Sequence, residues 1–185
     1  MIVLEPDALA QGLTSCEGNG QTDRRERLLK GAVTTLSGAG AQVYIDAGNP
    51  GFVTDVGKLA DGLRKSGVEQ AAGFALNVAN FKPTTDVASF GQRVSDLLGG
   101  SRYVIDTSRN GNGAYSGPQE PTWCNPPGRA LGTPPSRRTG IANVDAFLWV
   151  KRPGESDGNC RGGAPNAGQF WPDYALSLAR DTPGS

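Results

Sequence analysis

The residues of this chain that could do chemistry are carboxylic acids placed just after short apolar segments. Asp7, Asp46 and Asp106 each lie at the end of such a segment or within three residues of it. Carboxyl groups act as general acids and bases when their surroundings set different pKa values. A capping role in a turn or helix explains any one of these acids alone. Three acids in the same setting are harder to explain as caps, so the pattern favours carboxylate chemistry at a common site.

The composition excludes several other kinds of chemistry. The chain has no histidine, which removes Ser-His-Asp and Cys-His catalysis and histidine metal ligands. Its three cysteines, at positions 16, 124 and 160, do not have zinc-cluster spacing, and we expect neither a metal nor a cofactor. Because the cysteine count is odd, one thiol is free or its partner lies outside this chain. Acid–base chemistry must rest on carboxylates, with lysine, tyrosine or water in support.

The charge balance also narrows the choice of partners. Basic and acidic residues number 18 each, so the formal net charge is zero and no basic field attracts nucleic acid or an anionic membrane. No apolar run approaches the roughly 20 residues of a spanning helix. No signal peptide is visible, because Met1 leads directly into an apolar segment. We therefore expect a monomer with no nucleic-acid or membrane partner.

Five apolar segments have the length and composition of buried strands. They span residues 2–4, 42–45, 73–77, 103–106 and 146–150. Segments with helical spacing separate the first four, and the early strand starts lie about 30 residues apart, which is typical of βαβ units. A long loop rich in Gly and Pro precedes the fifth segment. The alternation predicts one α/β domain with a parallel sheet and right-handed crossovers.

The helix boundaries follow from capping signals. A polar loop is expected up to residue 22, and Asp23 with Glu26 resembles a capping box that starts the first helix. Its apolar face is predicted to include Leu28. Asp86 is expected to cap a later helix, and the last helix is expected over residues 168–180.

The strand ends are expected to bring polar groups together. In parallel α/β folds the carboxyl ends of the strands form one face, where active sites lie. That face would carry Asp7, Asp46, Asn80 and the segment 151–158, which combines two acids, two bases and two glycines. A solvated charged loop is the alternative interpretation of that segment. Trp123 fits either the core or a platform on which a sugar ring stacks.

Six sequence strings occur in a fixed order along the chain. They are LEPDALA, YIDAGNPGF, LNVANF, YVIDTSRNGNG, TWCNPPGRALG and FLWVKRPGESDGNC. Together they resemble glycoside hydrolase family 6, the cellobiohydrolases and endoglucanases that hydrolyse β-1,4-glucan with inversion, and actinobacterial members above all. The resemblance implies a secreted protein with a distorted, parallel TIM-like barrel. Residues 1–185 would form the C-terminal part of a single catalytic domain, because the family's first strands precede the EPD motif.

The resemblance also implies roles for individual residues. Asp7 resembles the general acid, Asp157 an acid proposed as base or as substrate contact, and Asp46 a third acid of the cleft. The implied substrate-binding positions are Asn49, Phe52, Asn80, Trp123, Asn125, Lys151 and Glu155. Asn49 and Phe52 stand where the family usually has His and Trp, which should weaken one sugar subsite.

The cysteines and the missing strands carry further expectations from the same resemblance. Cys124 and Cys160 match a family disulfide, whereas Cys16 matches a half-cystine whose partner lies in the absent part. That part also carries an aspartate that raises the pKa of the acid and a serine that holds the attacking water. Weak or no turnover is therefore expected from this chain. The rival interpretations are a non-catalytic glycan-binding remnant and an unstable gene fragment with an exposed sheet edge.

Overall fold

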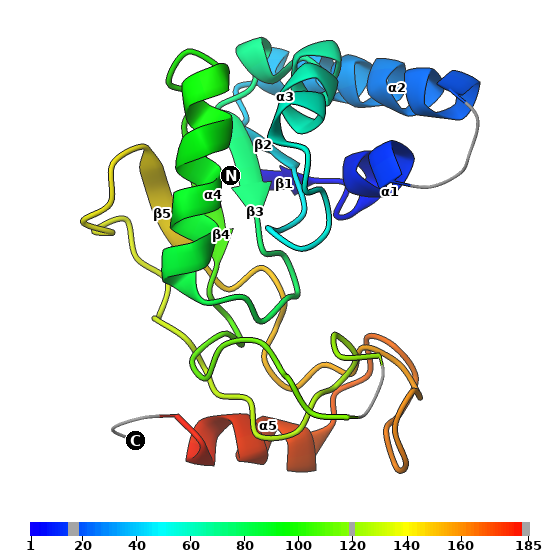
Figure 1. Ribbon diagram of the computed structural model, residues 1–185, viewed down its shortest axis with the longest axis vertical. Coiled ribbons are helices and arrows are strands. Elements are labelled where there is room, and N and C mark those ends of the chain that lie inside the picture. The colour runs from blue at the N-terminus through cyan, green and yellow to red at the C-terminus, as the bar shows by residue number, and fades with distance from the viewer. Residues whose placement is uncertain (15–18, 119–120, 183–185) are drawn as a thin grey trace.

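The computed structural model describes residues 1–14, 19–118 and 121–182 (Figure 1). The strands β1 (Ile2–Leu4), β2 (Val43–Asp46), β3 (Gly73–Leu76), β4 (Tyr103–Asp106) and β5 (Val144–Leu148) form one parallel sheet in sequence order. The helices are α1 (Ala8–Thr14), α2 (Asn19–Gly38), α3 (Val56–Lys65), α4 (Thr84–Leu97) and α5 (Pro172–Arg180), with a short 3-10 helix η1 (Val68–Gln70). The predicted five-stranded parallel α/β arrangement is confirmed.

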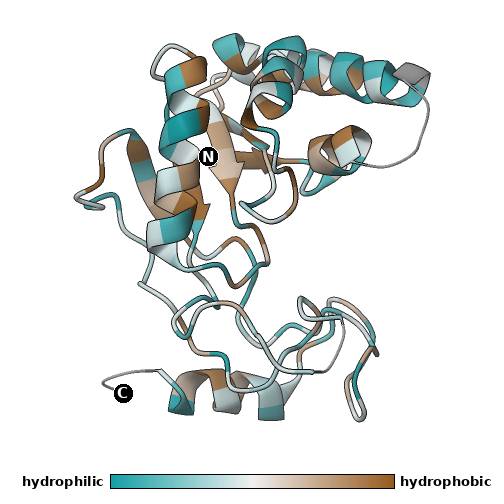
Figure 2. Cartoon of the chain, in the orientation of Figure 1, coloured by the Kyte–Doolittle hydropathy of each residue, from teal (hydrophilic) through white to brown (hydrophobic). Residues whose placement is uncertain are grey.

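The three central strands are buried on both faces. Every residue of β2, β3 and β4 is buried, as expected for parallel strands that read as continuous apolar runs. Alternate residues point to opposite faces. Val43 and Ile45 pack in the larger core with α1 to α4, whereas Tyr44 packs in a smaller cluster with Val104 and Ala146. Figure 2 shows the apolar residues concentrated in the strands and on the helix faces next to them.

The smaller cluster lies on the inner face of a curved sheet. The Tyr44 hydroxyl on β2 donates a hydrogen bond of 2.8 Å to Asp145 Oδ2 on β5. Neighbouring strands lie about 4.8 Å apart, so in a flat sheet β2 and β5 would be about 14 Å apart. The two side chains meet because the sheet curls toward this face, as the wall of a barrel does.

Several predicted boundaries are wrong. The loop after β1 contains α1, a helix of 7 residues that is too short to show clear periodicity. α2 begins at Asn19, so Asp23 and Glu26 lie inside the helix and form no capping box. Buried Glu26 instead lies 3.6 Å from the Lys65 ammonium on α3. Asp86 likewise lies in the first turn of α4, not at its cap.

The later elements are also displaced from their predicted positions. β5 runs from Val144 to Leu148, two residues before the predicted segment, because the chain leaves the sheet at Trp149. α5 begins at Pro172, which suits the first position of a helix because proline has no N–H to bond. Leu28 is 64% exposed, so it does not belong to the buried face of α2. Among the described residues, no helix is long and apolar enough to cross a membrane.

Candidate active site

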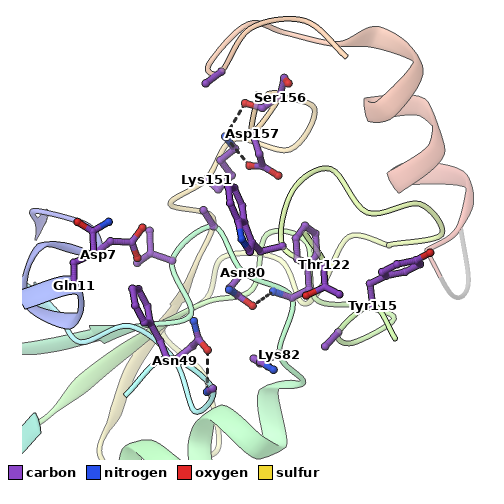
Figure 3. Close-up of a pocket in the computed structure, with 18 residues that line it drawn as sticks. Asp7, Gln11, Asn49, Asn80, Lys82, Tyr115, Thr122, Lys151, Ser156 and Asp157 are labelled. Carbon is purple, nitrogen blue, oxygen red and sulfur yellow. Dashed lines mark hydrogen bonds and ion pairs between the residues drawn. The ribbon is translucent and has the colours of Figure 1, made fainter. Parts of the chain in front are cut away.

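A cleft of about 640 Å³ opens at the carboxyl ends of the strands (Figure 3). Its wall is built from the segments that follow β1, β2 and β3 and from the long loops around β5. The lining residues include Asp7, Gln11, Asn49, Phe52, Asn80, Lys82, Tyr115, Thr122, Trp123, Lys151, Ser156 and Asp157. A cleft of this size is typical of a small-ligand site, and its place matches the rule for parallel α/β sheets.

Asp7 presents its carboxyl group to the cleft. Its backbone has φ of 67°, a left-handed conformation that aspartate tolerates better than most residues, and α1 starts at the next position. The Asp7 N–H donates a hydrogen bond of 2.8 Å to Asp46 Oδ2. Partial burial by the surrounding protein raises the pKa of the Asp7 carboxyl above its ordinary value. A carboxyl group with a raised pKa holds a proton to higher pH, as a general acid must.

Asp46 is completely buried and does not line the cleft. Its Oδ2 accepts N–H groups from Asp7 and Gly48, whereas its Oδ1 has no hydrogen-bond partner among the described residues. Burial raises the pKa of Asp46 to about 7, and the charges of Asp7 and Asp106 add to this, while the two N–H donors oppose it. Asp46 therefore acts on the cleft through the backbone of Asp7.

The raised pKa of Asp46 predicts a dependence of stability on pH. Because the folded-state pKa is about 7 and the ordinary value is 3.8, the folded protein keeps a proton that the unfolded chain releases between these pH values. The free energy of unfolding should fall as pH rises through this window, by on the order of a few kcal/mol. Asp46→Asn cannot ionise, and its amide oxygen can still accept both N–H groups, so this part of the slope should disappear.

Urea unfolding at several pH values across the window checks this prediction. Asp86→Asn is the matched control, because Asp86 is exposed in the first turn of α4 and its loss should leave the slope unchanged. An Asp46→Asn variant that keeps the full slope would contradict a protonated Asp46.

Asp106 has the capping role that was the alternative explanation for each single acid. Its Oδ1 accepts the N–H of Ser108 at 2.9 Å, and its Oδ2 accepts the N–H groups of Ala79 and Lys151, each at 3.0 Å. The carboxylate is buried and satisfied by three backbone donors. Asp106 thus ties the loop after β3 and the loop after β5 to the end of β4, and it helps to place Lys151.

Asp157 lies at the opposite side of the cleft, with both carboxylate oxygens engaged. Oδ2 accepts Arg109 Nη1 at 2.9 Å and the Asn125 N–H at 3.0 Å, and Oδ1 lies 3.3 Å from Lys151 Nζ. Lys151 Nζ also lies 3.3 Å from the carbonyl oxygen of Ser156. Two cations and a backbone donor therefore hold one carboxylate in a fixed orientation.

Arg109 is the buried member of this network, and no role was predicted for it from the sequence. The side chain is completely buried, its guanidinium carbon lies 4.4 Å from the centre of the Phe81 ring, and it donates to the Ala79 carbonyl. Its acidic partner, Asp157, lies 48 residues away in the sequence. No local pattern around Arg109 could have revealed the pair.

Removing Arg109 should be strongly destabilising. Arg109→Met would leave Asp157 with one cation fewer in a largely buried position, and breaking a buried pair in this way costs on the order of 3–5 kcal/mol. Arg152→Met is the control in a nearby loop, because the Arg152 side chain is 82% exposed and surface ion pairs contribute about 1 kcal/mol or less. Denaturant unfolding measures both, and equal losses would contradict a special role for Arg109.

The structure brings together most of the predicted binding residues, but not all. Asn49, Phe52, Asn80, Trp123 and Lys151 line the cleft. Trp123 is 56% exposed, so it is no core residue, and its ring is available for stacking. The segment 151–158 is more than a solvated loop, since Lys151, Ser156 and Asp157 all contribute to the wall.

Two predicted binding residues lie elsewhere. Asn125 is buried, and its amide bonds the Asp157 N–H at 2.8 Å and the Gly158 carbonyl at 2.7 Å. It shapes the Asp157 loop and does not line the cleft. Glu155 is also absent from the lining, and its carboxylate pairs with the exposed guanidinium of Arg152.

The sequence missed other wall residues, namely Gln11, Lys82, Tyr115, Thr122 and Ser156. Gln11 was missed because α1 was not foreseen. Tyr115 lies in the long loop, where the guanidinium carbons of Arg129 and Arg161 are 5.9 and 5.5 Å from its ring centre. Lys82 comes directly after the LNVANF string, and this position was the feature of the sequence that could have placed Lys82 in the cleft wall.

A disulfide joins the two long loops that carry the cleft. Cys124 and Cys160 are bonded, with 6.4 Å between their Cα atoms, as the resemblance implied. The bond ties the segment of Trp123 and Asn125 to the segment of Asp157. Cys16 lies outside the described residues. Among the described residues, no cluster of three His, Cys, Asp or Glu side chains could hold a metal ion.

Comparisons with known proteins agree with this geometry. The sequence profile described as "Glycosyl hydrolases family 6" matches residues 1–182. Endoglucanase A of Cellulomonas fimi is 49% identical over 181 residues, which cover 98% of this chain and 38% of that protein. Endoglucanase 1 of Streptomyces halstedii is 41% identical over 187 residues, covering 96% of this chain and 54% of the relative.

A solved structure gives the same result in three dimensions. The endoglucanase Cel6 from Mycobacterium tuberculosis, in complex with a methyl-cellobiosyl thio-cellobioside, superposes with a TM-score of 0.90 at 47% identity. The match covers 97% of this chain and 60% of that one. The chain thus spans between about two fifths and three fifths of these relatives. On the sequence match over nearly its whole length, the chain belongs to glycosyl hydrolase family 6.

Proposed function

We propose that this chain is the C-terminal part of a catalytic domain that hydrolyses β-1,4-glucosidic bonds in cellulose or a related β-glucan, with inversion of configuration. The observation that carries the proposal is the Asp7 carboxyl group, which faces the cleft with a raised pKa and is fixed through its backbone by buried Asp46. Relatives named endoglucanases and a relative solved with a cellobiose-based ligand support the substrate class.

Asp7 is the proposed general acid. The leaving sugar departs as an alkoxide unless its oxygen is protonated, so a carboxylic acid beside the glycosidic oxygen lowers the barrier. Burial raises the pKa of Asp7, which keeps the proton available at working pH. Asp46 is the proposed positioning residue, because its contact is with the Asp7 backbone and not with the cleft.

Asp157 is better suited to orientation than to proton removal. An inverting enzyme needs a base that activates water, with the two carboxyl groups roughly 6.5–9.5 Å apart. Asp157 already accepts bonds from Arg109, Lys151 and the Asn125 backbone, which leaves its carboxylate oxygens few positions at which to accept a hydrogen bond from a water molecule. Of the two roles implied by the resemblance, we therefore favour a substrate contact that also holds Lys151 in place.

The remaining wall residues suit a neutral, hydroxyl-rich polymer. The exposed Trp123 ring can stack on the C–H face of a sugar. Asn49 and Asn80 offer amide groups, and Lys151 offers an ammonium group, to sugar hydroxyls. Phe52 provides a smaller apolar surface in the cleft wall. Because cellulose is too large to enter a cell, the proposal requires a secreted enzyme, and we expect it to act as a monomer.

A glycan-binding protein without turnover is the second candidate. It would use the same cleft, because the exposed Trp123 ring, the amides of Asn49 and Asn80 and the ammonium group of Lys151 could bind a glycan whether or not Asp7 acts as an acid. The two candidates differ in catalysis and not in binding.

A hybrid enzyme tests the proposal. This chain would follow the N-terminal part of the catalytic domain of the Cellulomonas fimi relative, and the release of reducing ends from soluble β-1,4-glucan would be measured. We expect turnover by the hybrid. A hybrid that unfolds cooperatively and binds cello-oligosaccharides without cleaving them would overturn hydrolysis in favour of binding.

A further inference from the structure

Lys82 is a cationic side chain in the cleft wall that the proposed hydrolysis does not use. Its backbone is held on both sides, because Asn77 Oδ1 accepts the Lys82 N–H at 3.2 Å and Asn110 Nδ2 donates to the Lys82 carbonyl at 3.0 Å. The side chain is therefore anchored at its base, at the end of the loop after β3. The side chain is partly buried and is one of those that line the cleft (Figure 3).

The ammonium group lies over Gly51, on the side of the cleft formed by the segment after β2. A Cβ atom added to Gly51 would come within 3.1 Å of Lys82 Nζ and 3.2 Å of Cε. Glycine at this position leaves room for the lysine. Asn49 and Phe52 flank Gly51 and also line the cleft, and the Gly51 N–H donates to Asn49 Oδ1 at 3.0 Å. Lys82 thus lies at the end of the cleft formed by the segment from Asn49 to Phe52.

Lys82 Nζ has no hydrogen-bond or ion-pair partner within residues 1–14, 19–118 and 121–182. Lys151, the other lysine of the wall, contrasts with it, because its ammonium group pairs with Asp157 and bonds the Ser156 carbonyl. A lysine that is partly buried and unpaired is available to a ligand. The cost of desolvating its charge is recovered only when the ligand supplies acceptors.

Of the two lysines that line the cleft, Lys82 is the one whose ammonium group has no acidic partner among the described residues. Asp157 is offset by Arg109 and Lys151 together. Asp7 is the other lining carboxyl group, and its pKa is raised by burial. A neutral glucose unit beside Lys82 would offer hydroxyl acceptors but would leave the charge uncompensated. A carboxylate at the same place would form a charge-assisted hydrogen bond, which is stronger.

We propose that Lys82 makes the Asn49–Phe52 end of the cleft selective for glucan units that carry a carboxylate, as C6-oxidised glucose units do. The inference rests on the proposed binding of β-1,4-glucan in this cleft. It adds acidic glucans to the substrates of that function. The selectivity would come from Lys82, which takes no part in the proposed acid–base chemistry.

Calorimetric titration of the whole chain tests this proposal with two ligands. One is cellohexaose, and the other is cellohexaose in which C6 hydroxymethyl groups are oxidised to carboxylates. We expect the oxidised ligand to bind about threefold to tenfold more tightly, since charge-assisted bonds at a partly exposed site are of this strength. The preference should weaken at high ionic strength because salt screens the pair.

Three variants assign the preference to Lys82. Lys82→Met should reduce the ratio of the two affinities to about one, while Lys82→Arg, which keeps the charge, should retain it. Lys30→Met is the matched control, because Lys30 is exposed on α2 and does not line the cleft, so its loss changes the net charge equally and should leave the ratio intact.

The outcomes separate the inference from the proposed function. Equal binding of both ligands by the unaltered chain, or a preference that survives in Lys82→Met, overturns the inference and leaves glucan binding in place. A preference lost equally in Lys30→Met also overturns it, because a general charge effect would then be responsible. Failure of the chain to bind either ligand overturns the proposed glucan cleft and the inference together.

Discussion

Asp7→Asn in the hybrid enzyme is expected to lower the rate of cellulose hydrolysis by roughly two to four powers of ten, which is the range for loss of a general acid. An amide cannot donate the proton that the leaving glycosidic oxygen requires. The N–H of residue 7 can still donate to Asp46 Oδ2, so the local fold should persist. Rates on soluble β-1,4-glucan and on a cellobioside with a dinitrophenolate leaving group would be compared.

The comparison of leaving groups makes this prediction specific. Dinitrophenolate departs without protonation, so the Asp7→Asn enzyme should keep much of its rate on the activated substrate. Asp86→Asn is the control for a generic loss of negative charge, and both of its rates should be unchanged, because Asp86 lies on α4 outside the cleft lining. An equal loss on both substrates would indicate that Asp7 supports the structure and not the chemistry.

The 185-residue chain by itself is expected to hydrolyse β-1,4-glucan several powers of ten more slowly than the hybrid. When several groups act together in catalysis, the effects of removing them on the rate are not additive. Removing some of these groups can lower the rate nearly as much as removing all of them. Among the described residues β1 pairs only with β2, and Asp7, which follows β1, is only partly covered by protein. The related Mycobacterium tuberculosis chain has a further two fifths of its length that this chain does not match.

Reducing-end assays on both proteins at equal concentration would measure the difference. Thermal unfolding is the necessary control. A chain that does not unfold cooperatively is not properly folded, and it would lack activity for that reason alone. Hydrolysis by the chain at the rate of the hybrid would show that residues 1–185 contain every catalytic group.

The strands were predictable because their burial is continuous. β3 is apolar throughout, and β2 and β4 are apolar up to the aspartate that ends each of them, which is typical of strands buried inside a parallel sheet. α1 was not predictable, since seven residues make fewer than two full turns with a clear face. The start of α2 was misplaced because Asp23 and Glu26 have capping-box spacing but occur inside the helix.

The site was predictable from two sources, the polar residues that come soon after a strand and the motifs shared with the family. Asp7 and Asn80 were placed in the cleft from their positions after β1 and β3. The network around Asp157 was not, because its partner Arg109 is distant in sequence and lies in irregular loops. Asn125 was predicted to bind substrate from the resemblance alone, yet it is buried and holds the loop of Asp157.

The sequential order of the sheet has a consequence for how such a domain can be divided. Each strand from β2 to β5 pairs with the one before it, so none of these strands inserts between two earlier ones. A cut on the N-terminal side of β1 severs a single connection and leaves every crossover among these five strands intact. A family 6 domain split at that point is therefore suited to complementation in trans, in which two separately expressed polypeptides restore hydrolysis only when they associate.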